Sequence, residues 1–159
     1  MAFRKRRYTT LRGFLSDLFF PIANWRRLRQ VERKKLLSPS FRERLMMAVT
    51  AVNGCRYCSY FHSREALRTG ITPVEVRQLL SGTVSDAPEE EILALLYAQH
   101  WAETDASPAA DAVDRLQRAY GEDKANAIHL VLRMIRFGNL SGNTWDYFLY
   151  RLSFGRLGL

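Results

Sequence analysis

The sequence has few cysteines and no long apolar run. Its 159 residues include two cysteines, too few for the disulfide framework that stabilises small secreted domains. No apolar segment reaches the ~18 residues that a membrane span needs, and the basic start lacks the apolar segment and cleavage site of a signal peptide. We therefore expect a soluble protein of the reducing cytoplasm, where a close cysteine pair is more often catalytic or metal-binding than structural.

Strand signals and internal repeats are also lacking, since no stretch alternates apolar and polar residues. Apolar residues recur at helical spacing instead, and prolines, glycines and capping residues divide the chain into segments. The sequence predicts an all-α fold. The expected helices run from about 11 to Pro21, from Pro21 to 37, and over 39–54, 55–69, 73–80, 89–103, 108–120, 122–137 and 144–152, with a capping box at 72–75.

Positive charge is concentrated near the N-terminus. Residues 1–44 hold 13 Lys and Arg against 3 Asp and Glu, whereas the remainder holds 11 against 13. We divide the chain into a basic, amphipathic helical extension (1–37) and a compact helical domain (38–159). The extension could bind nucleic acid or an anionic membrane, but we favour a solvated basic face whose apolar residues pack on the body or on a neighbouring subunit. Those apolar residues are Phe14, Leu18, Phe19, Phe20 and Trp25.

Two cysteines and a histidine share one face of a predicted helix. Cys55, Cys58 and His62 are spaced i, i+3 and i+7, which places them along one strip. The start of a helix stabilises a thiolate at Cys55, and an imidazole one turn beyond Cys58 can take its proton. Two sulfurs at this spacing can close a disulfide with little backbone movement. An attacking thiol, a resolving thiol and a base suffice for two-electron thiol chemistry.

The preceding helix adds a carboxylate, Glu43. This helix is apolar over most of its circumference, so we expect Glu43 to be at least partly buried. A buried carboxylate needs a partner or a raised pKa. A proton path from Glu43 to His62 or Cys58 would explain its presence.

These residues resemble the AhpD-like branch of the carboxymuconolactone decarboxylase family. The pattern is Glu43, then Cys-Arg-Tyr-Cys at 55–58, then His62, and the likeness runs from about residue 42 to 82. The resemblance implies an alkylhydroperoxidase or disulfide reductase that forms a homo-oligomer, often a trimer or a multiple of it. Its substrate would be a small hydroperoxide or disulfide, its reductant a thiol or lipoyl-type compound, and its only redox group the Cys55–Cys58 disulfide.

The resemblance also assigns roles within the site. Peroxide would oxidise Cys58, Cys55 would resolve the product, and His62 with Glu43 would relay protons. Helix-terminus electrostatics alone favour Cys55 as the more acidic thiol, so the order of roles rests on the resemblance. Tyr57 departs from the pattern, because relatives with peroxidase activity often have a histidine there. A phenol with a pKa of ~10 relays protons less readily near neutral pH, which favours weak peroxidase turnover or thiol–disulfide exchange.

Other interpretations are weaker. A zinc site would need Glu43 or His129 as a fourth ligand, and no second Cys/His cluster exists. We expect His100 and His129 to be ordinary helix residues. A non-redox helical binding module would use the basic N-terminal face. A lyase or decarboxylase on the same scaffold would act without thiols, but the decarboxylase branch lacks the cysteine pair.

Overall fold

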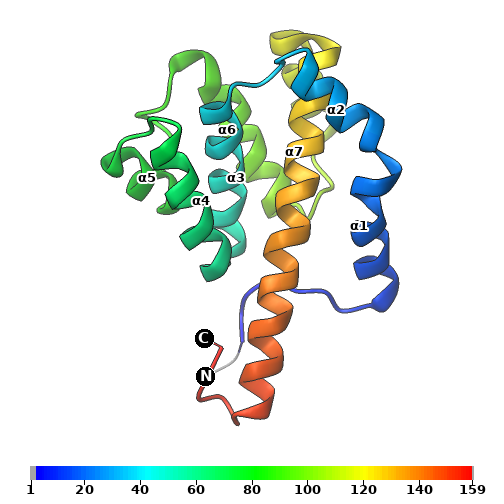
Figure 1. The fold of residues 1–159 in the computed structure, drawn as a ribbon, viewed down its shortest axis with the longest axis vertical. Helices are drawn as coiled ribbons and strands as arrows, with labels where there is room; N and C mark the ends of the chain where they lie inside the picture. The colour runs from blue at the N-terminus through cyan, green and yellow to red at the C-terminus, as the bar shows by residue number, and fades with distance from the viewer. Residues whose placement is uncertain (1–2, 159) are drawn as a thin grey trace.

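The chain is all-α, as predicted. The computed structural model describes residues 3–158 (Figure 1), which form seven helices and no strand. The helices are α1 (Leu11–Ala23), α2 (Trp25–Arg33), α3 (Pro39–Asn53), α4 (Arg56–Arg68), α5 (Pro73–Leu80), α6 (Glu89–Glu103) and α7 (Ala110–Leu152). No helix in this part of the chain is both long and apolar enough to cross a membrane.

The core is built around α3, which packs against α4, α5, α6 and α7. Its residues Leu45, Met47, Ala48 and Val49 are fully buried, and burying each large aliphatic side chain contributes about 1.5–3 kcal/mol. The much longer α7 runs past the whole bundle and extends beyond it (Figure 1). Helix α3 therefore presents side chains to both α4 and α7.

The hairpin that joins α3 to α4 follows the predicted signals. Ser38 caps α3 by accepting a hydrogen bond from the Phe41 amide (3.0 Å), and Pro39 fills its first turn. Gly54 ends α3 with φ +66° and ψ 32°, a left-handed conformation that favours glycine. The chain therefore reverses within a few residues, which sets the start of α4 beside the end of α3.

Helices α1 and α2 divide at a different residue from the one predicted. Pro21 was expected to begin the second helix, but it lies within the last turn of α1. Its fixed φ is compatible with a helix, and it removes only one hydrogen bond. The break falls at Asn24 (φ −108°, ψ 15°), whose backbone and side-chain N–H groups both donate to the Phe20 carbonyl at 3.0 Å.

The C-terminal helix also differs from the prediction. The expected break near Gly121 is present, since this residue has φ +73° and ψ 164°. The expected gap over 138–143 is wrong, because the chain is helical without interruption from there to Leu152. The two glycines in that gap serve a packing contact described below rather than a turn.

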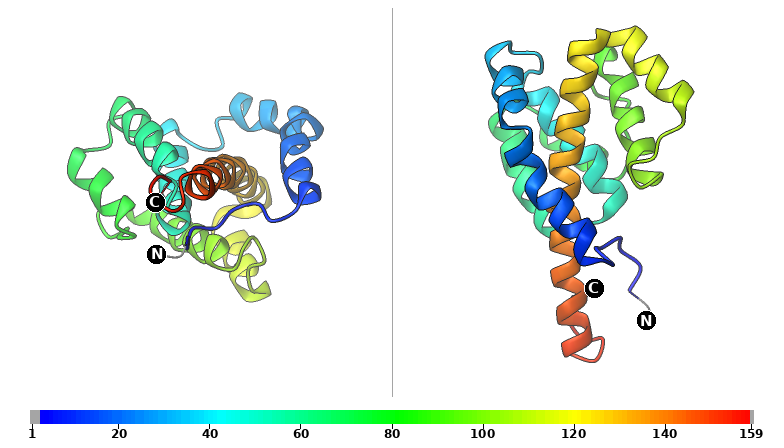
Figure 2. Two further views of the ribbon diagram at one scale, coloured as in Figure 1. Left: turned by 90° about the horizontal axis from the view of Figure 1, so that it is seen from below. Right: turned by 90° about the vertical axis from the view of Figure 1, so that its right-hand side faces the viewer.

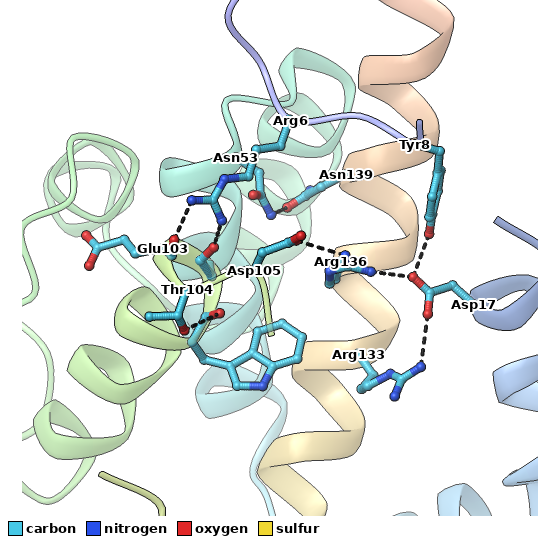
Figure 3. A network of polar contacts seen from close by, with 12 residues as sticks. Arg6, Tyr8, Asp17, Asn53, Glu103, Thr104, Asp105, Arg133, Arg136 and Asn139 are labelled. Atoms are coloured by element: carbon cyan, nitrogen blue, oxygen red, sulfur yellow. Dashed lines mark hydrogen bonds and ion pairs between the residues drawn. The ribbon is translucent and has the colours of Figure 1, made fainter. Parts of the chain in front are cut away.

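The N-terminal segment folds back along α7. Asp17 of α1 is buried and accepts hydrogen bonds from the Tyr8 hydroxyl (2.8 Å), Arg133 (2.9 Å) and Arg136. Figure 3 shows both arginines reaching from α7 to this carboxylate. The packing expected of the extension is therefore present on one side of α1 only. Of its apolar residues Phe14 and Phe20 are turned inward, whereas Leu18, Phe19 and Trp25 are exposed. The division of the chain at residue 37 stays a prediction.

Candidate active site

The two cysteines meet where α3 turns into α4. Cys55 is the N-cap of α4, one residue before the helix, and its sulfur accepts a hydrogen bond from the Cys58 amide at 3.3 Å. Both thiols are free, with the two Sγ atoms 2.9 Å apart. Cys55 is fully buried, whereas Cys58 is partly exposed. The hairpin thus brings together the two sulfurs that the sequence predicted, with only one accessible.

The two thiols have opposite pKa shifts. Donation from the Cys58 thiol, and from the backbone amides of Cys58 and Tyr57, lowers the pKa of Cys55 to about 7 against the opposing effects of burial and of Asp146. The pKa of Cys58 is raised, because its proton is held by Cys55 and because it is buried beside that sulfur. Above pH ~7 the pair therefore carries one negative charge, centred on Cys55, and one proton, held by Cys58.

Glu43 and His62 form a second pair beside the first. Glu43 extends from α3 and His62 from α4, and the Glu43 Oε2 atom lies 2.8 Å from the His62 Nδ1 atom. Their side chains are 14% and 12% exposed, so the contact is largely shielded from water. A carboxylate at Nδ1 fixes the orientation of the ring and leaves Nε2 as the atom that can take up or release a proton. Within residues 3–158 no hydrogen bond joins His62 to either sulfur.

The Tyr57 hydroxyl forms its hydrogen bond with a carboxylate of α7. Its hydroxyl donates to the Oδ1 atom of Asp146 at 2.9 Å, and the Arg56 guanidinium lies beside both groups. The ring is 41% exposed, so Tyr57 forms part of the rim of the site. Its hydroxyl proton points toward α7.

The sequence analysis missed the part of the site that α7 supplies. Gly142 allows a close approach, since a Cβ atom placed there would lie 2.8 Å from the Cys55 sulfur and 3.2 Å from the Tyr57 ring. One turn earlier, a Cβ at Gly138 would lie 3.7 Å from the Cys58 sulfur. The signal was present as Gly-Asn at 138–139 and again at 142–143. A spacing of four residues places both pairs on one helix face.

Buried amides line the same face of α7. Asn139 accepts a hydrogen bond from Asn53 (3.1 Å) and donates to the Thr50 hydroxyl (3.1 Å). Its side chain also hydrogen-bonds Cys58, which lowers that pKa against the larger opposing effects. Asn143 donates to the backbone carbonyl of Asn53 at 2.8 Å. These bonds fix the end of α3, and hence the cysteine turn, against α7.

Asp146 completes this face as a fully buried carboxylate. It accepts hydrogen bonds from Tyr57, from Arg56 (2.8 Å) and from Lys5 Nζ (3.2 Å). Three donors, two of them cations, compensate for its loss of hydration. Asp146 therefore ties the N-terminal segment and the start of α4 to α7, immediately beside the cysteines.

The other two histidines lie away from the cysteines. The His129 Nε2 atom and the Tyr97 hydroxyl share a hydrogen bond of 2.7 Å. Burial lowers the pKa of His129. It lines a cavity of about 670 Å³ between α2, α6 and α7. His100 accepts from the Ala109 amide at 3.3 Å. Among the described residues, no group of three or more His, Cys, Asp or Glu side chains is arranged to hold a metal ion.

Comparison with known proteins gives one match. Residues 23–100 match the model of the carboxymuconolactone decarboxylase family. Neither curated proteins nor solved structures gave a significant match. The matched range contains Glu43, both cysteines and His62, whereas Lys5 and the glycines, asparagines and aspartate of α7 lie outside it.

Proposed function

From the match of residues 23–100 to the carboxymuconolactone decarboxylase family, we propose that the protein is a thiol-dependent oxidoreductase of the AhpD type. The observation that carries the proposal is the pair of free sulfurs 2.9 Å apart at the cap of α4. A buried Glu43–His62 pair one turn further along the helix supports it. The substrate class is a small hydroperoxide or a disulfide.

Peroxide reduction would begin at Cys58. This sulfur is the accessible one, and its proton can pass to the adjacent Cys55 as a substrate approaches. The Cys58 thiolate attacks the terminal peroxide oxygen, the O–O bond breaks, and the products are a sulfenic acid and an alkoxide that takes a proton to become an alcohol. His62, held by Glu43, is the group we assign to supply that proton.

Resolution would use Cys55. Its proton departs, its sulfur attacks the sulfenic sulfur of Cys58, and the S–O bond breaks with release of water. A nearby, buried thiol suits this role, because its sulfur lies 2.9 Å from that of Cys58 and is shielded from bulk oxidant. An external dithiol then reduces the Cys55–Cys58 disulfide, so no further cofactor is needed.

Thiol–disulfide exchange is the second candidate, and the position of Tyr57 favours it. The Tyr57 hydroxyl donates to Asp146, which leaves His62 as the proton donor to a peroxide leaving group. A disulfide substrate needs less assistance, because its leaving thiolate is a weaker base than an alkoxide. A thiol or lipoyl-type partner and a cytoplasmic homo-oligomer belong to both versions of the proposal.

The test combines mass spectrometry with single-turnover kinetics. Cumene hydroperoxide should convert the wild type to an intramolecular disulfide, and Cys55→Ser should accumulate a sulfenic acid at Cys58. Cys58→Ser should lose the reaction, whereas His100→Ala, the matched histidine control, should retain it. Rapid reaction with oxidised lipoamide but not with hydroperoxide would select the exchange reaction. Two unreactive thiols toward both reagents would contradict the proposal.

A further inference from the structure

Helix α1 has an apolar side that the chain does not cover. Leu11, Leu15, Leu18 and Ile22 follow spacings of four, three and four residues, so that at 3.6 residues per turn they form one stripe. We call these four residues the outer stripe. Leu11 and Ile22 are 73% and 71% exposed, and Leu15 and Leu18 are each 38% exposed. Such a continuous exposed apolar surface indicates an interaction site.

A different side of α1 already has its partner. Phe14 contacts the ring of Phe137 on α7 (6.0 Å between centroids), and Asp17 pairs with Arg133 and Arg136. Figures 1 and 2 show α1 at the periphery, with only its inner side against α7. A helix with a second apolar side needs a second apolar environment, and these contacts supply only one.

Positive charges predominate beside the outer stripe, since α2 contains a single acidic residue, Glu32, which pairs with Arg42. Arg12 follows Leu11, and α2 adds Arg26, Arg27, Arg29 and Arg33, none of which has an ion-pair partner among residues 3–158. Trp25 is 56% exposed at the start of α2 with the Arg29 guanidinium 4.9 Å from its ring. An apolar stripe, an exposed tryptophan and unpaired arginines are the features of a helix that lies in a membrane interface.

We propose that α1 and α2 bind the surface of an anionic phospholipid membrane. The outer stripe enters the boundary between headgroups and acyl chains, and the arginines of α2 contact the lipid phosphates. A two-fold contact with a second copy of the chain fits less well, because two like faces would bring unpaired arginines together without acidic partners. Nucleic acid also fits less well, because phosphates give the outer stripe no apolar environment.

Membrane binding through α1 sets the direction in which the cysteine site faces. Helix α4 lies on the side of α7 opposite α1 (Figures 1 and 2), so a membrane at α1 leaves the start of α4 open to the aqueous phase. The inference stands independently of the proposed thiol chemistry. If both hold, the enzyme meets water-borne substrates and reductants while it is attached to the membrane.

The test measures co-sedimentation of the full chain with vesicles. Vesicles of phosphatidylglycerol and phosphatidylcholine should bind the wild type, pure phosphatidylcholine should bind it at least about tenfold more weakly, and added NaCl should reduce binding. Leu11→Ser/Ile22→Ser and Arg26→Glu/Arg29→Glu should each weaken binding at least about tenfold. All four positions are exposed, so these variants should fold normally.

Matched controls change the same residue types elsewhere. Leu67→Ser/Leu96→Ser removes two exposed leucines of α4 and α6, and Arg115→Glu/Arg118→Glu reverses two exposed charges of α7; both should bind as the wild type does. Three results would overturn the proposal. They are equal loss in the controls, loss in the arginine variant with none in the leucine variant, and a change of molar mass in the leucine variant without loss of vesicle binding, which would assign the outer stripe to a second copy.

Discussion

Two buried carboxylates lie on different sides of α7 and have closely similar partners. Asp17, on the side of α1, is held by Arg133, Arg136 and the Tyr8 hydroxyl. Asp146, on the side of the cysteines, is held by Lys5, Arg56 and the Tyr57 hydroxyl. Each has two cations and one phenol, which is enough to compensate for burial.

The difference lies in what surrounds each carboxylate. The partners of Asp17 come from α7 and from the segment before α1, so this carboxylate joins α1 to α7. Asp146 lies one turn beyond Gly142, and its charge raises the pKa of Cys55. The same arrangement of groups therefore supports the fold on one side of α7 and adjusts a thiol on the other. Replacing Asp146 should therefore alter redox chemistry, whereas replacing Asp17 should alter the stability of the fold alone.

The largest effect should come from Gly142→Ala. The added Cβ would lie 2.8 Å from the Cys55 sulfur, so either α4 or the sulfur must move, at a cost of about 1–3 kcal/mol in unfolding free energy. We expect disulfide formation by peroxide to slow by at least about 10²-fold, because a 1 Å displacement of a reacting group can cost that much. Thermal unfolding and single-turnover kinetics measure the two effects.

Gly138→Ala is the matched control for this substitution. A Cβ there would be in ordinary contact with the Cys58 sulfur at 3.7 Å. Replacing a helical glycine by alanine should then stabilise the fold by about 0.5–1 kcal/mol with little change in rate. Equal damage from both substitutions would contradict the close-approach role of Gly142.

Glu43→Gln should have the next largest effect. The amide keeps the shape of the side chain but removes the charge that holds the His62 Nδ1 proton. We expect peroxide reduction to slow by about 10²-fold with little loss of stability. Glu65→Gln, in the more exposed Glu65–Arg68 pair of α4, is the control and should react as the wild type does. Unchanged turnover in Glu43→Gln would remove the pair from the proton path.

The local parts of the fold and site were predictable from the sequence. Ser38-Pro39, Gly54 and Thr72 delimit α3, α4 and α5 because each acts on its own few residues of backbone. Glu43 could be placed beside His62 or Cys58 in advance because a short hairpin joins their helices. The capping box at 72–75 was only half right. The Thr72 hydroxyl accepts from the Glu75 amide, but the Glu75 carboxylate turns to Arg44.

The contribution of α7 could not be predicted, because it depends on contacts between residues about 85 positions apart. Gly138 and Gly142 were interpreted as a gap between helices, since glycine usually weakens a helix. Their role becomes visible only when the cysteine sulfurs are placed against them. Asp146 gave no signal of burial either, because the cations that hold it come from the N-terminal segment and from α4.

A smaller effect should follow from removal of the Cys58 thiol. Donation from this thiol is the main cause of the lowered pKa of Cys55. Cys58→Ala should therefore raise that pKa from about 7 to ~8.5 or above, because burial remains. Cys58→Ser retains a hydroxyl donor and should give an intermediate value. The pH dependence of thiolate absorbance measures both, and a pKa that stays near 7 in Cys58→Ala would show that backbone amides suffice.

The smallest effect should come from neutralising the two buried carboxylates, Asp146 and Asp17. Asp146→Asn removes a negative charge that raises the pKa of Cys55, so this pKa should fall below about 7, and the thiolate absorbance of Cys55 should reach half-maximum at lower pH. Asp17→Asn removes an equally buried charge and should leave that midpoint unchanged, while both variants lose about 1–3 kcal/mol of stability. The direction of the pKa shift distinguishes the two roles of Asp146, because loosening of the structure there would weaken the hydrogen bonds to Cys55 and raise the pKa of Cys55 instead. A fall confined to Asp146→Asn therefore identifies this carboxylate as an electrostatic control on the thiol, whereas a rise, or an equal shift in Asp17→Asn, would reduce both carboxylates to supports of the fold.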